Sequence, residues 1–187
     1  MKPKKDFDKI AEDTYLVKFS PSYPLGDFNC IIQEYNDWLT HDAEPTIASG
    51  ITNVHLLINS HTEKIIAYMA LCTDSFFISD EEKQNIKCEK IAYSSFPALK
   101  IGKLAIDKEY VGLNCGSYMI EIAFAIAGKF NDELGVACRF LTVDADVRFD
   151  KNTPNFYLQN GFVFNTENRY KKRTESLSMR RDIYQKI

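Results

Sequence analysis

The amino-acid sequence predicts a mixed α/β fold in a single domain spanning residues 1–187. Short apolar runs with strand character alternate with segments whose apolar residues recur at helical spacing. The length of 187 residues suits one compact domain, and 45% apolar with 26% charged residues is an average globular composition. No internal repeat or linker divides the chain, so one core built from strands and helices is expected.

The first predicted helix follows a loop at residues 20–26, whereas residues 7–18 give only a weak signal. Asp27 is placed as the N-cap of this helix, and Pro45 lies beyond its expected end. One face carries apolar side chains at helical spacing, namely Phe28, Ile31, Ile32, Tyr35, Trp38 and Leu39. The pattern is typical of an amphipathic helix with one buried face.

Residues 54–58 and 64–73 predict two strands, and the polar residues 59–63 between them suit a hairpin. Residues 76–78 extend or follow this sheet. The polar insert at residues 80–90 is expected to form a loop or a short exposed helix.

Residues 99–107 predict the next strand, which leads into a long helix ended by Gly135. The buried face of that helix is marked by Met119, Ile120, Ala123, Phe124, Ala127, Phe130 and Leu134. A strand at 138–143 and a short helix at 154–158 follow. The last two strands, 162–164 and 176–184, are separated by a basic segment expected to form a solvated turn: Arg169, Lys171, Lys172 and Arg173.

Charge and cysteine content argue against several classes of protein. The net charge of −3 gives no overall attraction to nucleic acids or acidic lipids. The five cysteines form no C-x-x-C pair and are expected to be reduced thiols in a cytoplasmic protein. No histidine has zinc-ligand spacing, so no metal is expected. No apolar stretch follows the N-terminus or reaches 18 residues, so neither a signal peptide nor a membrane span is expected.

The segment from Ile101 to Ser117 carries the strongest chemical signal. A predicted strand enters a loop containing Gly112 and Gly116, and the loop opens the long helix. Glycine lets a ligand approach the backbone closely, and a helix start offers unpaired N–H groups with partial positive charge. The arrangement suits an anion, most often phosphate. Close packing of the helix on the sheet explains the two glycines equally well.

The glycine spacing excludes two familiar phosphate loops. No lysine follows Gly116, so the segment is not G-x-x-x-x-G-K-[ST], and it does not match G-x-G-x-x-G either. A second feature lies about 40 residues further on, in the run Phe156-Tyr157-Leu158-Gln159-Asn160-Gly161-Phe162. Taken alone, Phe156 and Tyr157 are compatible with simple core aromatics.

In this order, the two features resemble the GNAT family of acyl-CoA-dependent N-acetyltransferases. Leu104-Ala105-Ile106-Asp107 with its glycine loop and helix is similar to the family's central acyl-CoA motif. Residues 140–145 are similar to the next strand, and residues 156–162 to the F-Y-x-x-x-G-F signature. The resemblance covers residues 98–164 and implies a mostly antiparallel central sheet of α+β type flanked by helices. The match is weakest in the N-terminal third, where the family builds its acceptor site.

The family loop reads [QR]-x-x-G-x-[GA], and here it departs at two positions. Val111 stands where the family has Gln or Arg, and Asn114 stands where it has Gly. Asn is the mildest substitute if φ is positive there. The resemblance implies acetyl-CoA as co-substrate, without a metal, bound by Leu104, Ala105, Ile106, Gly112, Leu113, Asn114, Cys115, Gly116 and Ser117. The family position of Cys115 is apolar, so a packed thiol is favoured over a nucleophile.

The family chemistry is direct attack of an amine on the thioester. A backbone N–H in the strand around Leu104–Ile106 would stabilise the oxyanion. Tyr157 matches the position from which many members protonate the leaving thiolate, and its hydroxyl suits that role. No general base is assigned. The nearest carboxylates are those of Asp107, Glu109 and Asp144, and each of them can equally be structural.

The resemblance leaves three functions open. The first is an active N-acetyltransferase for a primary amine of a small molecule or a protein. The second is a CoA-binding regulator that has lost catalysis, which the residues Val111 and Asn114 suggest. The third is a toxin-type member that acetylates aminoacyl-tRNA, although the negative net charge argues against a nucleic-acid partner. A homodimer is compatible with the sequence, and no membrane partner is expected.

Overall fold

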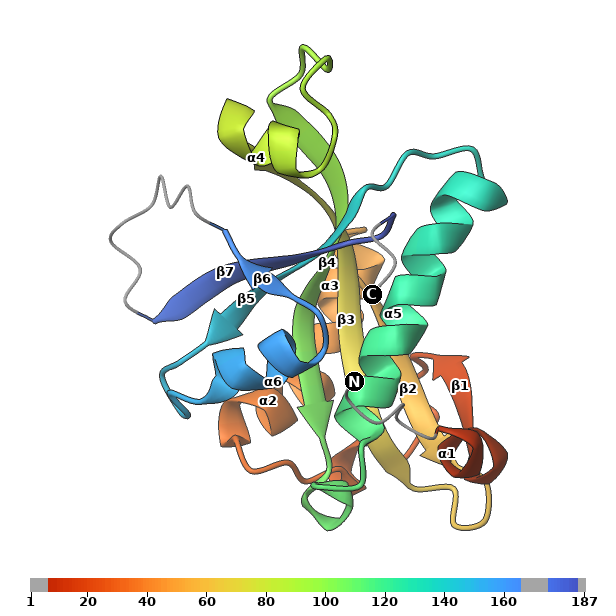
Figure 1. Ribbon diagram of the computed structural model, residues 1–187. Helices are drawn as coiled ribbons and strands as arrows, with labels where there is room; N and C mark the ends of the chain where they lie inside the picture. Colours follow the sequence, from red (N-terminus) through yellow and green to blue (C-terminus); the bar gives the residue numbers. More distant parts are fainter. Residues whose placement is uncertain (1–6, 166–174, 185–187) are drawn as a thin grey trace. The chain divides into compact units, whose positions relative to one another are not determined.

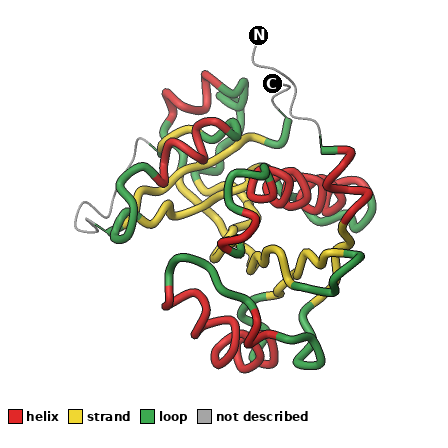
Figure 2. Tube along the Cα trace, turned by 90° about the horizontal axis from the view of Figure 1, so that it is seen from below, coloured by secondary structure: helices red, strands yellow, loops and turns green. Residues whose placement is uncertain are grey.

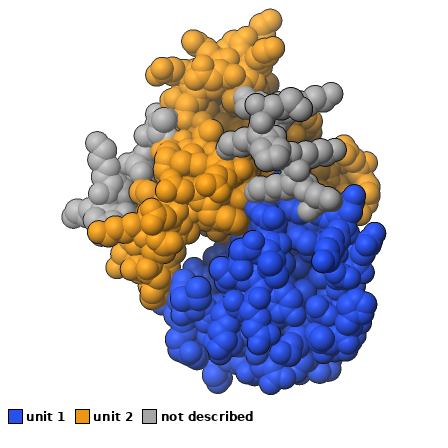
Figure 3. Space-filling model, turned by 60° about the horizontal axis from the view of Figure 1, so that its bottom comes forward, with its two compact units in different colours: residues 1–72, 102–122 blue, residues 73–101, 123–187 orange. Residues whose placement is uncertain are grey.

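The computed structural model describes residues 7–165 and 175–184, and the chain divides into two compact units (Figures 1 and 3). Unit 1 comprises residues 1–72 and 102–122, and unit 2 comprises residues 73–101 and 123–187. Three elements pass from one unit into the other, namely β3 (Ile65–Phe77), β4 (Ser95–Ile106) and α5 (Cys115–Asp132).

The strands form one mixed sheet in the order β1-β2-β3-β4-β5-β7-β6. The pairs β1–β2, β2–β3, β5–β7 and β6–β7 are antiparallel, whereas β4 and β5 are parallel. The predicted mixed, mostly antiparallel sheet flanked by helices is therefore confirmed.

Unit 1 begins with α1 (Asp8–Asp13) and the edge strand β1 (Thr14–Lys18), which the weak pattern of residues 7–18 did not predict. β1 pairs with β2 (Asn53–Asn59), and β2 pairs with β3, as expected for the predicted hairpin. β3 continues through Phe77, so residues 76–77 extend the strand, which is one of the two alternatives that the sequence leaves open.

The N-terminal helical region differs from the single helix that the sequence predicts. Asp27 does not cap it but ends η1 (Leu25–Asp27), a short 3-10 turn. The helix starts at α2 (Gln33–Asp37), passes through a π-helical turn, η2 (Trp38–Asp42), and continues as α3 (Ala43–Ala48). Ile31 therefore precedes the helix and is exposed.

Pro45 lies inside α3 and not beyond the helix end. The π-helical turn explains this difference, because the N–H of Ala43 donates to the carbonyl of Trp38, five residues back. This extra residue per turn interrupts the i→i−4 ladder just before Pro45, whose missing N–H and bulky ring would otherwise disrupt the helix.

The core of unit 1 joins this helical region to one face of β2, β3 and β4. Leu39 and Ala43 pack with Leu56 of β2, Tyr68 of β3 and Ala105 of β4. Trp38 stacks on Tyr68 with ring centroids 5.8 Å apart. The apolar stripe of the predicted helix is therefore buried as expected from Tyr35 onward, where all the stripe residues are at least half-buried.

The chain leaves β4 through a 3-10 turn, η3 (Lys108–Tyr110), and then enters α5, the long regular helix in Figure 2. Met119, Ile120, Ala123 and Ala127 are buried, as the helical spacing predicts. Leu134 is an exception, because α5 ends at Asp132 and Leu134 is 65% exposed. Gly135 follows with a left-handed φ of 63°, the conformation expected where a helix ends in glycine.

Unit 2 contains α4 (Asp80–Asn85), β5 (Phe140–Asp146), α6 (Thr153–Gln159), β6 (Val163–Phe164) and β7 (Ser176–Asp182). The predicted insert helix exists, but it is not simply exposed. Glu82 of α4 is buried, and its carboxylate accepts a hydrogen bond from the guanidinium of Arg180 of β7 in an ion pair, with Oε1 and Nη2 2.6 Å apart. The predicted basic turn at residues 169–173 lies outside the described residues.

None of the helices in residues 7–165 and 175–184 combines the length and apolar character that a membrane crossing requires. Within the same residues, no three His, Cys, Asp or Glu side chains gather in a way that could hold a metal ion. Three cysteines, Cys30, Cys115 and Cys138, are buried, and all five are free thiols.

Candidate cofactor site

The C-terminal part of β4 carries the residues predicted to lie beside the thioester. The parallel ladder with β5 joins residues 98–101 of β4 to residues 140–143 of β5. Leu104, Ala105 and Ile106 lie beyond these paired residues, in unit 1. In a strand, successive side chains alternate between faces, and the side chain of Ala105 belongs to the core beneath α2 and η2. The backbone of this stretch is the predicted source of the oxyanion donor.

The loop after η3 contains two residues with a left-handed backbone conformation. Gly112 has φ of 85°, and Asn114 has φ of 63°. Both values lie in the left-handed region, which favours glycine and which Asn tolerates better than most residues. Asn114 therefore preserves the backbone conformation at the position where the family pattern has Gly. The loop residues from Val111 to Asn114 are exposed.

The start of α5 supplies main-chain donors directly after this loop. The first intrahelical hydrogen bond runs from the N–H of Tyr118 to the carbonyl of Asn114, at 3.0 Å. The first N–H groups of a helix have no carbonyl acceptor within the helix, and Cys115 and Gly116 are the first two residues of α5. An α-helix of 18 residues adds partial positive charge at this end. All the predicted loop residues therefore belong to one strand–loop–helix segment of unit 1.

Two side chains of this segment differ in their exposure to solvent. Val111 is 54% exposed, so the position that carries Gln or Arg in the family pattern is open to solvent here. Cys115 is buried, and its burial raises the pKa of its thiol. A raised pKa lowers the thiolate fraction at neutral pH, which favours the packed thiol over a nucleophile.

The carboxylates named as possible bases have partners. Asp107 is 7% exposed and accepts hydrogen bonds from the main-chain N–H groups of Asn29 and Glu109. Glu109 is exposed and pairs with Lys64 at 3.3 Å. In unit 2, Asp144 pairs with Lys100 at 2.8 Å. These contacts support structural roles for all three carboxylates.

Tyr157 lies on α6 in unit 2 and is 7% exposed. Its ring contacts the rings of Phe156 and Phe162 in edge-to-face geometry, with centroids 5.1 and 5.4 Å away. Gly161, with φ of 81°, turns the chain from α6 toward β6, as expected of the glycine in the signature. Tyr157 and the glycine loop belong to different units, and each is described within its own unit.

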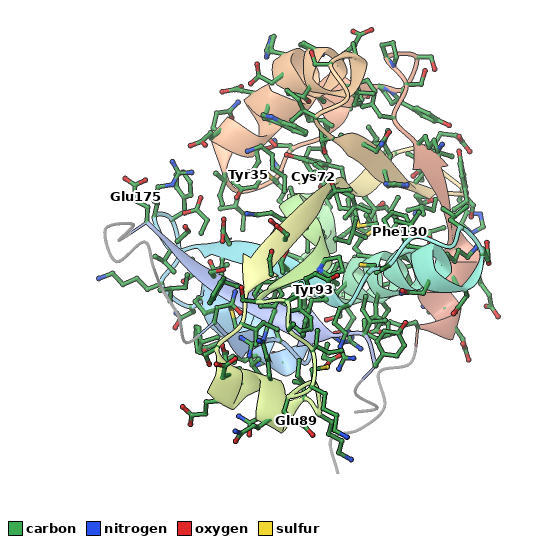
Figure 4. The ribbon with its side chains drawn as sticks, turned by 90° about the horizontal axis from the view of Figure 1, so that it is seen from above. Tyr35, Cys72, Glu89, Tyr93, Phe130 and Glu175 are labelled. Carbon is green, nitrogen blue, oxygen red and sulfur yellow. The ribbon has the colours of Figure 1, made fainter. Side chains whose placement is uncertain are left out.

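Sequence reasoning missed a cationic side chain near the predicted oxyanion strand. The ammonium of Lys103 lies 4.7 Å from the ring centroid of Tyr35 and 5.2 Å from that of Trp38. Tyr35, labelled in Figure 4, comes from α2, and its carbonyl accepts a hydrogen bond from the buried Tyr68 hydroxyl. The available signal is that Lys103 is the only charged residue in the run 101–106, since a charge among apolar residues needs a partner.

Unit 1 also has a polar hollow of about 280 Å³ between the loop before α2 and one face of the helical region. Its lining contains the carboxylates of Asp27 and Asp37 and no basic side chain: Gly26, Asp27, Phe28, Asn29, Gln33, Asn36, Asp37 and Thr40. A hollow lined in this way attracts a protonated amine and repels a phosphate.

No family model matches the chain, and no curated protein matches it. Solved structures do match. AtaT complexed with acetyl-methionyl-tRNAfMet is 22% identical with a TM-score of 0.71 and aligns over 89% of this chain and 94% of its own. A tyrosine-to-phenylalanine mutant of KacT is 20% identical with a TM-score of 0.73, over 91% and 95%. AtaTR bound with AcCoA is 21% identical with a TM-score of 0.70, over 92% and 95%.

These likenesses show the fold. AtaT and KacT are toxins with the GNAT acetyltransferase fold, and the chain has that fold over about nine-tenths of its length. The resemblance inferred from residues 98–164 therefore extends to the N-terminal third as well. The expectation that no nucleic acid takes part is weakened, because AtaT, with the same fold, is solved in complex with a tRNA.

Proposed function

We propose that the protein is an N-acetyltransferase that moves the acetyl group of acetyl-CoA to a primary amine. The observation that carries this proposal is the passage from β4 through the left-handed Gly112 and Asn114 into the first turn of α5. A fold shared with AtaTR bound with AcCoA supports it. We also propose that residues 1–187 act as one functional domain, since the structural matches span nearly the whole chain.

The chemistry of the loop fits a diphosphate. Its donors are main-chain N–H groups at the start of a long helix, and its left-handed residues leave the backbone open to a ligand. In the proposed assignment, Gly112, Leu113, Asn114, Cys115, Gly116 and Ser117 hold the diphosphate. Leu104, Ala105 and Ile106 present their backbone to the acyl end. Acetyl-CoA supplies the activated thioester, and no metal is required.

The catalytic work of the chain is then limited to three tasks. A main-chain N–H of β4, in the stretch Leu104–Ile106, donates to the carbonyl oxygen as negative charge develops there. The hydroxyl of Tyr157 donates its proton to the departing sulfur. The amine must be neutral when it attacks, and the residue or water that accepts its proton is not assigned.

Two acceptor classes have specific support. The acidic hollow lined by Asp27 and Asp37 favours a small cationic amine, because carboxylates attract protonated amines to the hollow. The complex of AtaT with acetyl-methionyl-tRNAfMet favours the amino group of an aminoacyl-tRNA. The net charge of −3 fits the first class better, so a small amine is the primary proposal and the tRNA acceptor the second.

The deciding experiment begins with mass spectrometry of the purified protein for bound CoA, followed by calorimetry with acetyl-CoA. A thioester-consumption assay is then run over a panel of polyamines, amino acids and charged tRNA. Turnover with an amine of either class supports the enzyme. Tight CoA binding without turnover would favour the regulator, and absence of CoA binding would contradict both. A tRNA acceptor predicts binding that weakens steeply as salt rises.

A further inference from the structure

The side chain of Asp107 closes a bridge between two segments that are far apart in the sequence. Its Oδ2 accepts the N–H of Asn29 at 2.8 Å, and its Oδ1 accepts the N–H of Glu109 at 2.9 Å. The carbonyl of Asn29 in turn accepts the N–H of Lys108 at 3.0 Å. Because all the donors are main-chain groups, the bridge fixes the path of the backbone rather than the rotamers of neighbouring side chains.

The same stretch is held from its other side. The N–H of Asp107 donates to the carbonyl of Ile66 on β3 at 2.8 Å, so β4 is still paired where the bridge begins. The carbonyl of Asp107 accepts the N–H of Tyr110 at 2.9 Å, which closes the turn η3. The chain is therefore held at Asp107 by four main-chain groups, immediately before it turns toward Gly112.

The position of the glycine loop follows from this anchoring. Only Val111 separates the anchored turn from Gly112, and only Leu113 and Asn114 separate Gly112 from α5. Main-chain donors bind an anion well only if they already point toward it before binding. An error in the direction of the chain at residues 107–110 would therefore misdirect the loop N–H groups.

We propose that Asp107 is a positioning residue for the diphosphate part of CoA, acting through the backbone of the loop and not through contact with substrate. The proposal rests on the proposed function and goes beyond it, because the resemblance leaves Asp107 as a possible base or an ordinary structural residue. In this proposal the carboxylate of Asp107 supports cofactor binding and does not act as the general base.

The test compares two ligands that differ in the diphosphate. Asp107→Asn keeps the size of the side chain but places an NH2 group against one of two N–H donors. Binding of CoA is measured by calorimetry. Binding of S-acetylpantetheine, which has the thioester arm but no diphosphate, is measured by competition. Glu109→Gln is the matched control, because it removes a charge two residues away that pairs with the exposed Lys64.

Asp107→Asn should weaken CoA binding by about tenfold or more. Loss of one hydrogen bond to a charged group changes a binding constant by about that factor. S-Acetylpantetheine affinity should stay unchanged, as should CoA affinity in Glu109→Gln. Asp107→Ser, which can still accept one of the two bonds, should fall between Asp107→Asn and the wild-type protein, and it serves if Asp107→Asn does not fold.

Unchanged CoA affinity in a folded Asp107→Asn protein would overturn the proposal. Equal losses for CoA and S-acetylpantetheine would also overturn it, because they would indicate general damage to the site. If the wild-type protein itself bound no CoA, the proposed function would fail, which is a separate result from either of these.

Discussion

Tyr157 and Phe162 contact each other through both backbone and side chain. The N–H of Phe162 donates to the carbonyl of Tyr157 at 3.1 Å, and the two rings pack edge to face with their centroids 5.4 Å apart. The ring of Tyr157 is thus fixed by its backbone and by the apolar rings beside it. The phenolic hydroxyl is not needed for either contact, which makes removal of the hydroxyl alone an informative experiment.

Tyr157→Phe should lower kcat by about 10²–10⁴ if the hydroxyl protonates the departing sulfur, because loss of a general acid typically has that effect. The affinity for CoA and the melting temperature should change little, since the ring and its contacts remain. The measurement is kcat on any accepted amine, together with Tm.

Tyr184→Phe is the control for this experiment, because Tyr184 is an exposed tyrosine of unit 2. It should leave kcat and Tm unchanged. A Tyr157→Phe protein with full turnover and a reduced Tm would assign the hydroxyl to the fold and remove Tyr157 from the mechanism.

Gly116→Asp should strongly weaken CoA binding. Gly116 is the second residue of α5, so the new carboxylate would lie where the proposed diphosphate accepts the first N–H groups of the helix. Ala125→Asp places the same charge on an exposed position of the same helix and should leave CoA affinity intact. Calorimetry that finds equal affinities in both variants would reject the loop as the binding site.

Val111→Arg should tighten CoA binding by about 1 kcal/mol, the contribution of one added charge-assisted contact in a solvated site. The side chain at this position is exposed, so the longer residue needs no repacking. The gain should shrink as salt is raised. Weaker binding in the variant would mean that the loop runs along a different path relative to the diphosphate than the family pattern implies.

The stability of the protein should fall as the pH drops below about 6.5, partly because of His55. Burial lowers the pKa of His55, and Lys18 nearby lowers it further. Its buried Nδ1 has no hydrogen-bond partner among the described residues. Since the unfolded chain binds the proton more readily, the contribution of neutral His55 is complete above the unfolded pKa of about 6.5 and is lost as pH falls toward the lower folded value.

His55→Gln should therefore show a smaller loss of unfolding free energy between about pH 7.5 and pH 5 than the wild-type protein. Urea unfolding at both pH values measures this difference. His41 and His61 are present in both proteins and so cancel in the comparison. An identical pH dependence in the two proteins would exclude His55 as a contributor.

Glu82→Ala should destabilise the fold by about 3–5 kcal/mol, the usual cost of leaving one member of a buried ion pair uncompensated. Both Glu82 and Arg180 are buried, and Arg180 also donates to Asn165 at 2.7 Å. Glu133→Ala removes the exposed pair with Lys129 and should cost less than about 1 kcal/mol. Chemical denaturation of both variants provides the test, and similar small losses would show that the Glu82 pair adds little.

The sequence alone predicts those elements that depend on residues close together in the chain. The apolar spacing of Met119 to Ala127 and the glycine at 135 predicted α5 and its end, since a helix buries every third or fourth residue. The glycine loop was found for the same reason, because a left-handed backbone conformation strongly restricts the residue types at its positions. The order of strand, loop, helix and F-Y-x-x-x-G-F signature then indicated the fold.

The features that the sequence does not predict depend on contacts with residues far away in the chain. Glu82 looked like a solvated charge because its partner, Arg180, lies 98 positions away. The break between Asp27 and the helix start at Gln33 depends in part on Asn29 being held by Asp107, 78 positions along the chain. The strand β1 gave a weak pattern since it is a sheet edge with mixed burial, and only pairing with β2 defines it.

The division of the chain has a consequence for folding during synthesis. Unit 1 needs residues 102–122, which the ribosome makes after residues 73–101 of unit 2. Unit 1 therefore cannot complete its native contacts until Ile122 has left the exit tunnel, and by then β3 already extends into unit 2. Each unit is built from two separate segments of the chain. Incomplete chains should therefore remain sensitive to proteases until most of the protein has been synthesised.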